Sequence, residues 1–247
     1  MPIPARSRLL AGSRTGRRTA LAAVALLPAL ALTAGCGGGD KKPGPVKASG
    51  AVPAAALTRA LLTSSDLAHV QSLPAGDKSL LLGGAQKPDK PDCQPVADQW
   101  TTQPKHPRQV YAGAMLTDTA DPDKNAKTIS LDVIASYKKG EAQKVLDELT
   151  ESLRTCHGYQ VVRNGATTTF AVKQVPQTGA PLGDQQVSYT IGDVATGAKG
   201  TVLVTVVRTG DATASYETVR ADHKAAALRL AIPLKQAEKL EKAAAGG

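Results

Sequence analysis

The sequence predicts an α+β fold: one domain with an antiparallel β-sheet flanked by helices. Segments of alternating apolar and polar residues, separated by short turns, dominate its second half. Helical patterns occur near both ends and once in the middle, without the regular strand–helix alternation of a parallel α/β protein. Residues 36–247 suit one domain with a flexible tail.

The strand predictions rest on period-two alternation. In 127–137, apolar residues such as Ile129, Leu131 and Val133 alternate with mostly polar ones, which predicts a strand with one buried face. Asn164-Gly165 predicts a type I′ turn between two strands. The other predicted strands are 108–117, 159–163, 166–175, 186–192, 201–208 and 212–219.

The clearest predicted helix is 141–156, whose apolar residues and Cys156 fall on one side. Gly158 is well placed to cap its end. Less regular patterns predict helices at 54–62, 64–70, 93–101 and 221–245, the last bent near Pro233, and an irregular stretch at 73–92.

The N-terminus has the layout of an export signal. Five arginines and no acidic residue lie in 1–35, which contains the apolar run Ala20–Leu32. That run is shorter than the roughly 20 residues of a membrane-spanning helix. We therefore predict a signal peptide at 1–35, a Gly/Pro/Lys-rich tether at 36–53 and the folded domain at 54–247.

Leu32-Thr33-Ala34-Gly35-Cys36 resembles the lipobox of bacterial lipoproteins. The resemblance implies cleavage before Cys36, diacylation of its sulfur and retention on the extracytoplasmic face of the cell membrane. Two acyl chains suffice for stable anchoring. Arg17-Arg18 leaves both Sec and twin-arginine export open.

Charge and composition exclude some partners. The chain has 30 basic and 21 acidic residues, a net charge of +9. Without the five signal arginines, the net charge falls to about +4. No basic block with interleaved aromatic residues remains, so nucleic-acid binding is not expected. Seven aromatic residues also argue against an aromatic sugar-binding platform.

Cys93 and Cys156 are the two cysteines that remain if Cys36 is acylated. In an exported protein such a pair predicts a disulfide, here closing the loop from residue 93 to residue 156. The alternative is two buried free thiols.

No catalytic or metal-binding constellation is predicted. Ser136 and Lys139 match an S-x-x-K motif, but Ser136 ends a predicted strand, and we expect it and Lys138 to form an exposed strand end. Asp121, Asp123 and Asn125, with Asp132, have calcium-loop spacing without its glycine and glutamate, so a turn is favoured. We therefore predict no cofactor and no enzymatic activity.

The strand 201–208 offers a clue to binding. Val202, Leu203, Val204, Val206 and Val207 place apolar residues on both of its faces. One face should meet helices. The other is either covered by more structure, as in a central strand, or lines an apolar cleft.

Four short motifs occur in a particular order: LLTSSDL (61–67), DCQPVAD (92–98), LRTCHG (153–158) and VLVTVVRTGD (202–211). In this respect residues 61–219 resemble the PknH-type extracellular sensor domain of actinobacterial receptor kinases. The resemblance implies an antiparallel sheet with flanking helices around a cleft for an undefined envelope ligand. It also implies that Cys93 and Cys156 form one family disulfide; a second, typical of the family, has no cysteines here.

The leading functional hypothesis is thus a lipid-anchored, non-enzymatic ligand-binding or sensor module outside an actinobacterial membrane. Its expected partners are the membrane and an apolar envelope ligand. The alternative is an envelope scaffold that binds a membrane protein and no small ligand. A deep apolar cleft beside 201–208 would favour the first hypothesis, and a flat apolar surface patch the second.

Overall fold

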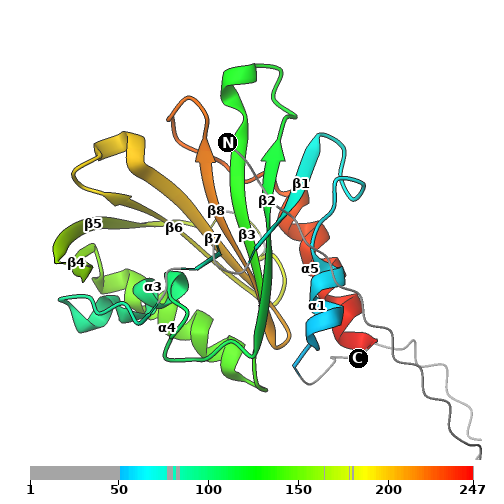
Figure 1. Cartoon of the computed structure of the whole chain (residues 1–247), viewed down its shortest axis with the longest axis horizontal. Coiled ribbons are helices and arrows are strands. Elements are labelled where there is room, and N and C mark those ends of the chain that lie inside the picture. The colour runs from blue at the N-terminus through cyan, green and yellow to red at the C-terminus, as the bar shows by residue number, and fades with distance from the viewer. Residues whose placement is uncertain are drawn as a thin grey trace, which may run out of the picture. The chain divides into compact units, whose positions relative to one another are not determined.

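Eight strands form a single sheet in the order β1-β2-β3-β8-β7-β6-β5-β4. Every neighbouring pair is antiparallel, which confirms the predicted α+β class (Figure 1). The computed structural model describes residues 51–246 except 77–79, 82–83, 164, 178 and 180. The strands are β1 Val70–Ala75, β2 Val110–Asp118, β3 Thr128–Ser136, β4 Gly158–Arg163, β5 Ala166–Val175, β6 Gln185–Asp193, β7 Thr201–Thr209 and β8 Ala212–Arg220. The helices are α1 Ala54–Ala60, α3 Gln94–Ala97, α4 Glu141–Thr155 and α5 Ala231–Ala245.

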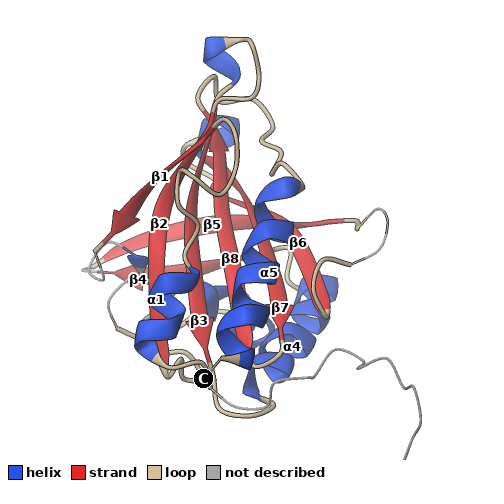
Figure 2. Cartoon of the chain, turned by 90° about the vertical axis from the view of Figure 1, so that its right-hand side faces the viewer, coloured by secondary structure: helices blue, strands red, loops and turns tan. Residues whose placement is uncertain are grey.

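The two halves of the sheet are covered on opposite faces. Helices α1 and α5 pack on one face of the sheet, which we call the back face. This face is turned toward the viewer in Figure 2, so the two helices lie nearer to the viewer than the strands. Their core includes Leu57 and Leu240 from the helices and Leu116, Ile134 and Tyr216 from the sheet. Helices α3 and α4 pack on the other, front face; that core includes Val96, Leu149, Tyr189, Val204 and Val206.

Strand β7 lies where the two layers overlap. Val204 and Val206 belong to the front core, whereas Val207 belongs to the back core. The centre of this strand is therefore covered on both faces, as the first alternative for 201–208 requires. Val202, at its start, is only partly buried and packs at the margin of the front core.

The prediction of one buried face for 127–137 is wrong. Ser130, Asp132 and Ser136 are almost fully buried, although they occupy the polar positions of the alternation. By contrast, Ile129 is 37% exposed. The reason is the position of β3 in the interior of the sheet, where α5 and α1 cover the face that carries the polar residues.

Two predicted helical segments are not helical. Residues 64–69 form turns, in which the Asp66 carboxylate accepts hydrogen bonds from the Thr63 amide at 2.7 Å and from Lys239 of α5 at 2.7 Å. Residues 221–230 precede α5, and Arg229 there donates to Asp118 at 2.7 Å. In both segments, contacts with distant residues override a local helical preference.

Gly158 does not cap α4 but begins β4. A side chain at this position would place a Cβ 2.5 Å from the carbonyl oxygen of Phe170, because the two strands approach closely there. The glycine thus allows strand pairing and not helix termination.

Residues 1–50, which include Cys36, the predicted signal peptide and most of the predicted tether, lie outside the described residues. The packed core already includes Val52, which is 3% exposed. None of the helices in the described part of the chain is both long enough and apolar enough to cross a membrane.

Candidate functional site

An apolar cavity of about 280 Å³ lies on the front face, between the sheet and the 3-10 turn Asp98–Trp100. Two cross-strand pairs contribute to it, Tyr159–Phe170 on β4 and β5 and Ile191–Val202 on β6 and β7. Val202 thus places the cavity beside the 201–208 strand. The other lining residues are the apolar Ala97, Trp100 and Val161, the glycines Gly192 and Gly200, and the polar Gln86, Arg163 and Asp193.

Aromatic side chains are concentrated at this cavity. The only tryptophan of the chain, Trp100, and the only phenylalanine, Phe170, both line it, together with Tyr159. The Tyr159 and Phe170 rings lie 5.4 Å apart between centroids and are tilted by 42°. In a sequence with seven aromatic residues, this convergence marks the cavity as unlike the rest of the surface.

Arg108 fixes the turn that carries Trp100. Its guanidinium donates hydrogen bonds to the carbonyl oxygens of Thr101 at 2.7 Å and of Asp98 and Gln99 at 3.1 Å each. Because one rigid cation holds three carbonyls around the tryptophan, the indole has a defined place in the cavity wall.

The segment 84–93 closes another side of the cavity. Asp89 pairs with the edge strand β4: its amide donates to the Gln160 carbonyl at 3.0 Å, and its carboxylate accepts from the Gln160 amide at 2.6 Å. Gln86, which lines the cavity, accepts from the Gln94 side chain through its carbonyl at 2.9 Å. The prediction of an irregular stretch at 73–92 is wrong at both ends, because residues 73–75 belong to β1 and residues 91–92 begin a 3-10 helix. Residues 84–90 are irregular, as predicted, and are held in place by these bonds.

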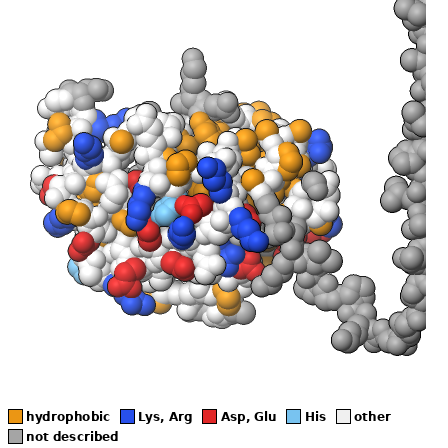
Figure 3. Space-filling model, turned by 90° about the horizontal axis from the view of Figure 1, so that it is seen from below, with side chains coloured by type: hydrophobic (Ala, Val, Ile, Leu, Met, Phe, Trp, Pro, Cys, Tyr) orange, Lys and Arg blue, Asp and Glu red, His pale blue; other side chains and the backbone are white. Residues whose placement is uncertain are grey.

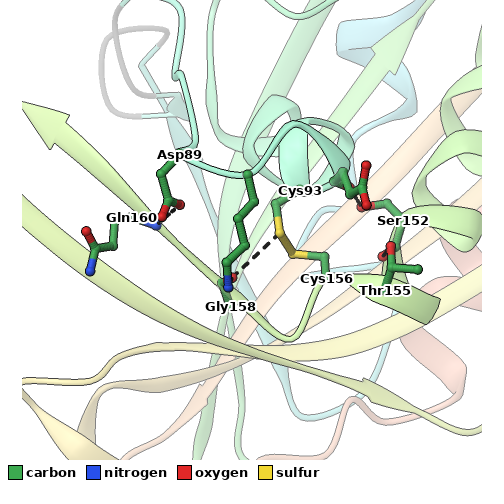
Figure 4. The surroundings of a disulfide bond; sticks show 9 residues. Asp89, Cys93, Ser152, Thr155, Cys156, Gly158 and Gln160 are labelled. Atoms are coloured by element: carbon green, nitrogen blue, oxygen red, sulfur yellow. Dashed lines mark hydrogen bonds between the residues drawn. A yellow bond between two sulfur atoms is a disulfide. The ribbon is translucent and has the colours of Figure 1, made fainter.

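A disulfide joins Cys93, at the end of this segment, to Cys156, at the end of α4 (Figure 4). Their Cα atoms are 5.2 Å apart, and both residues are buried in the front core. The structure therefore contains the predicted pair and not two free thiols. Next to it, Lys90 donates to the Gly158 carbonyl at 2.9 Å.

Two ionisable groups, Tyr189 and Glu217, lie in one cross-strand row on the front face of the sheet. Tyr189 is fully buried, and its hydroxyl faces the indole nitrogen without the geometry of a full hydrogen bond. Burial raises the pKa of Tyr189 well above its usual value. Glu217 follows in the same cross-strand row, beyond Val204. Burial raises the pKa of Glu217 to about 7, opposed by the positive charge of Arg108.

A separate polar pair is enclosed beneath α5 on the back face. Asp132 and Tyr216 are cross-strand partners, and both are fully buried. Neither side chain has a hydrogen-bond partner. Burial raises the pKa of Asp132 to about 8, so this carboxyl group is mostly protonated at neutral pH.

The motifs that resembled catalytic or metal sites do not assemble. Ser136 is fully buried, so the expectation of an exposed strand end is wrong for it, although Lys138 is exposed. Asp121 and Asp123 each accept a backbone amide within their own loop at 2.9 Å, while Asp132 lies inside the sheet. Within the described ranges, no three potential metal-ligating side chains of His, Cys, Asp or Glu come together.

Another groove differs from the apolar cavity in the chemistry of its walls. It measures about 420 Å³, lies between α3 and α4 and is lined largely by polar and charged residues. On the face shown in Figure 3, acidic and basic side chains are interspersed and form no field of one sign. The charged residues of this groove contrast with the largely apolar cavity beside β7.

Sequence reasoning missed the residues of the apolar cavity. Tyr159, Phe170 and Val202 were assigned to strands, but nothing in their spacing showed that they meet Trp100. The sequence does contain one relevant observation, which is the low number of large aromatic residues. Because the chain has one tryptophan and one phenylalanine, these two side chains are candidates for a shared site.

The family of PknH-like extracellular domains matches residues 52–229, most of the chain. The chain belongs to the PknH-like extracellular domain family. The crystal structure of the extracellular domain of PknH from Mycobacterium tuberculosis is similar to this PknH-like domain, with a TM-score of 0.52. The two share 12% sequence identity over 78% of this chain and 97% of the other. No curated protein matches the chain significantly.

Membership of this family indicates the general type of the PknH-like domain. It is an extracellular, sensor-type domain. The four short motifs all lie within the matched residues.

Proposed function

We propose that this protein is a membrane-anchored, extracytoplasmic binding or sensor module that takes up the apolar part of an envelope ligand without chemical conversion. The cavity beside β7 carries the proposal, because it combines apolar walls with the only tryptophan of the chain. Apolar pockets with a few polar groups are the usual form of small-molecule sites. The diacylated Cys36 would hold the domain at the membrane, where such ligands are found.

The walls of the cavity are held in place by features that resist collapse. Paired strands form its floor, Arg108 fixes the Trp100 turn, and the disulfide ties the segment 84–93 to α4. A preformed site avoids the free-energy cost of ordering loops on binding. This rigidity favours binding of a small ligand over a purely structural role for the cavity.

The test uses Trp100 as a built-in reporter. Titration with a straight-chain C10 alcohol should shift or quench the emission of this single tryptophan. Val202→Phe, which fills the cavity, should weaken binding at least about tenfold, since it displaces several methylene groups worth about 0.8 kcal/mol each. Val162→Phe adds the same side chain on the other face of β4, where Val162 is 70% exposed, and should not change binding.

Native mass spectrometry of the protein from its own envelope gives an independent measurement. A co-purifying apolar molecule that is lost in Val202→Phe would support the proposal. Protein that is consistently free of such molecules, together with an unresponsive Trp100, would refute it.

One observation favours the alternative of an envelope scaffold. Leu73, Met115, Ile129 and Val219 are exposed and share the front face of the β1–β2–β3–β8 half of the sheet, where Leu73 pairs with Met115 and Ile129 with Val219. Under this hypothesis, another envelope protein covers these four apolar side chains. Met115→Ser with Ile129→Ser should then release one defined membrane protein, whereas Val202→Phe should retain it.

A further inference from the structure

Charged groups are rare at the apolar cavity, and one of them stands without a partner. Arg163 ends β4, and its exposed side chain lines the cavity at its open side. The backbone of Arg163 pairs with Ala166, but its side chain has no hydrogen bond and no ion pair in the described part of the chain. The carboxylate of Asp193, also at the cavity, accepts the amide of Ala195 at 2.9 Å and is not bonded to Arg163.

The other arginines show that such isolation is unusual in this domain. Among the described residues, only Arg59, on α1, shares it. The guanidinium of Arg108 is bound to carbonyls. The remaining arginines pair with acidic side chains: Arg154 with Glu151, Arg208 with Asp184, Arg220 with Asp222 and Arg229 with Asp118.

The size of the cavity limits the apolar part of a ligand. A methylene group takes up about as much space as a water molecule, roughly 30 Å³, so the volume of about 280 Å³ has room for on the order of ten methylene groups. A chain of that length fits the apolar walls but leaves its head at the open side, where Arg163 lies.

We propose that the ligand is an anionic amphiphile: an apolar chain of about ten carbons in the cavity with a phosphate or carboxylate head bound by Arg163. The inference rests on the proposed ligand-binding function and adds the chemistry of the head group. A guanidinium offers a fork of N–H donors that matches these anions. Asp193 disfavours an anion close to its free oxygen, so the head group lies on the Arg163 side of the opening.

The experiment compares C10 probes that differ only in the head group. The full chain carrying Cys36→Ala is used, so that neither an acyl anchor nor detergent competes for the cavity. Trp100 emission is followed with decyl phosphate, decanoate, decanol, decyltrimethylammonium and inorganic phosphate. All amphiphiles are kept below the concentrations at which they form micelles.

Decyl phosphate and decanoate should bind about three- to tenfold more tightly than decanol, a modest factor because Arg163 is exposed. Arg163→Gln should lower their affinity to that of decanol without changing decanol binding, and Arg163→Lys should recover part of the loss. Lys173→Gln removes the same charge from the other face of β5 and should have no effect. A response to decyl phosphate but not to inorganic phosphate assigns the ligand to amphiphiles and not to the free anion.

The outcomes separate the two proposals. Equal binding of decanol and decyl phosphate, unchanged by Arg163→Gln, would overturn the head-group assignment and leave the cavity function standing. Tighter binding of decyltrimethylammonium than of decyl phosphate would also overturn the head-group assignment. The Asp193 carboxylate would then be the group that selects the head. Failure of every C10 probe to bind would refute the proposed function itself.

Discussion

Replacing Asp132 by Asn should remove much of the pH dependence of the stability of this domain. Asp132 is fully buried on the back face of the sheet, and its carboxyl oxygens have no hydrogen-bond partner. Burial raises its pKa from 3.8 to about 8. The folded state therefore keeps a proton that the unfolded chain has lost at neutral pH, and stability falls as pH rises between these two values.

The magnitude follows from the size of the shift. Each pH unit within this window costs about 1.4 kcal/mol of the free energy of unfolding. Between pH 5 and pH 7, Asp132 alone thus lowers the stability by up to about 2.7 kcal/mol. Glu217, with a pKa raised to about 7, adds a change of the same sign. The carboxylates with lowered pKa values, such as Asp66 at about 2, lose their stabilising effect only in more acidic solution.

The assay is urea unfolding at pH 5, 6 and 7, which gives the free energy of unfolding at each pH. In Asp132→Asn, the free energy of unfolding should change with pH only by the amount due to Glu217. Addition of Glu217→Gln should reduce this remaining pH dependence further. Asp121→Asn, in an exposed loop, is the matched control and should follow the wild type. If the buried amide prevents folding, Asp132→Leu offers a second non-ionisable side chain. Identical slopes for the wild type and a folded Asp132 variant would show that Asp132 does not hold a proton in the folded state.

Two further predictions concern the cysteines. Reduction of the Cys93–Cys156 disulfide, or Cys93→Ser with Cys156→Ser, should lower the stability by about 4 kcal/mol, because the bridge constrains a long loop of the unfolded chain. Thermal unfolding with and without a reductant measures this change, and a melting temperature that is insensitive to the reductant would contradict it. Cys36→Ala should move the protein from the membrane fraction to the soluble extracytoplasmic fraction, as detected by fractionation and blotting. Continued retention in membranes would show that the anchor is not the predicted lipid.

Local patterns predicted most of the secondary structure because they reflect local physics. The apolar stripe of α4 follows from the helical period, and the alternation in β6 follows from the two faces of a sheet. The prediction failed where distant contacts decide the outcome. Residues 221–230 have helical propensity, yet they form turns, bends and irregular chain before α5, and Arg229 there donates a hydrogen bond to Asp118.

The sequence by itself determined the fold class, the pairing of the two domain cysteines and the resemblance to extracellular sensor-type domains. These properties depend on period, composition and motif order along one chain. Only the tertiary structure brought Trp100 to Tyr159, Phe170 and Val202, and only the tertiary structure buried Asp132 on a face that alternation marks as polar. The physical reason is the same in both cases. The order of strands and the placement of helices decide which faces are covered, and neither is encoded in the pattern of any single strand.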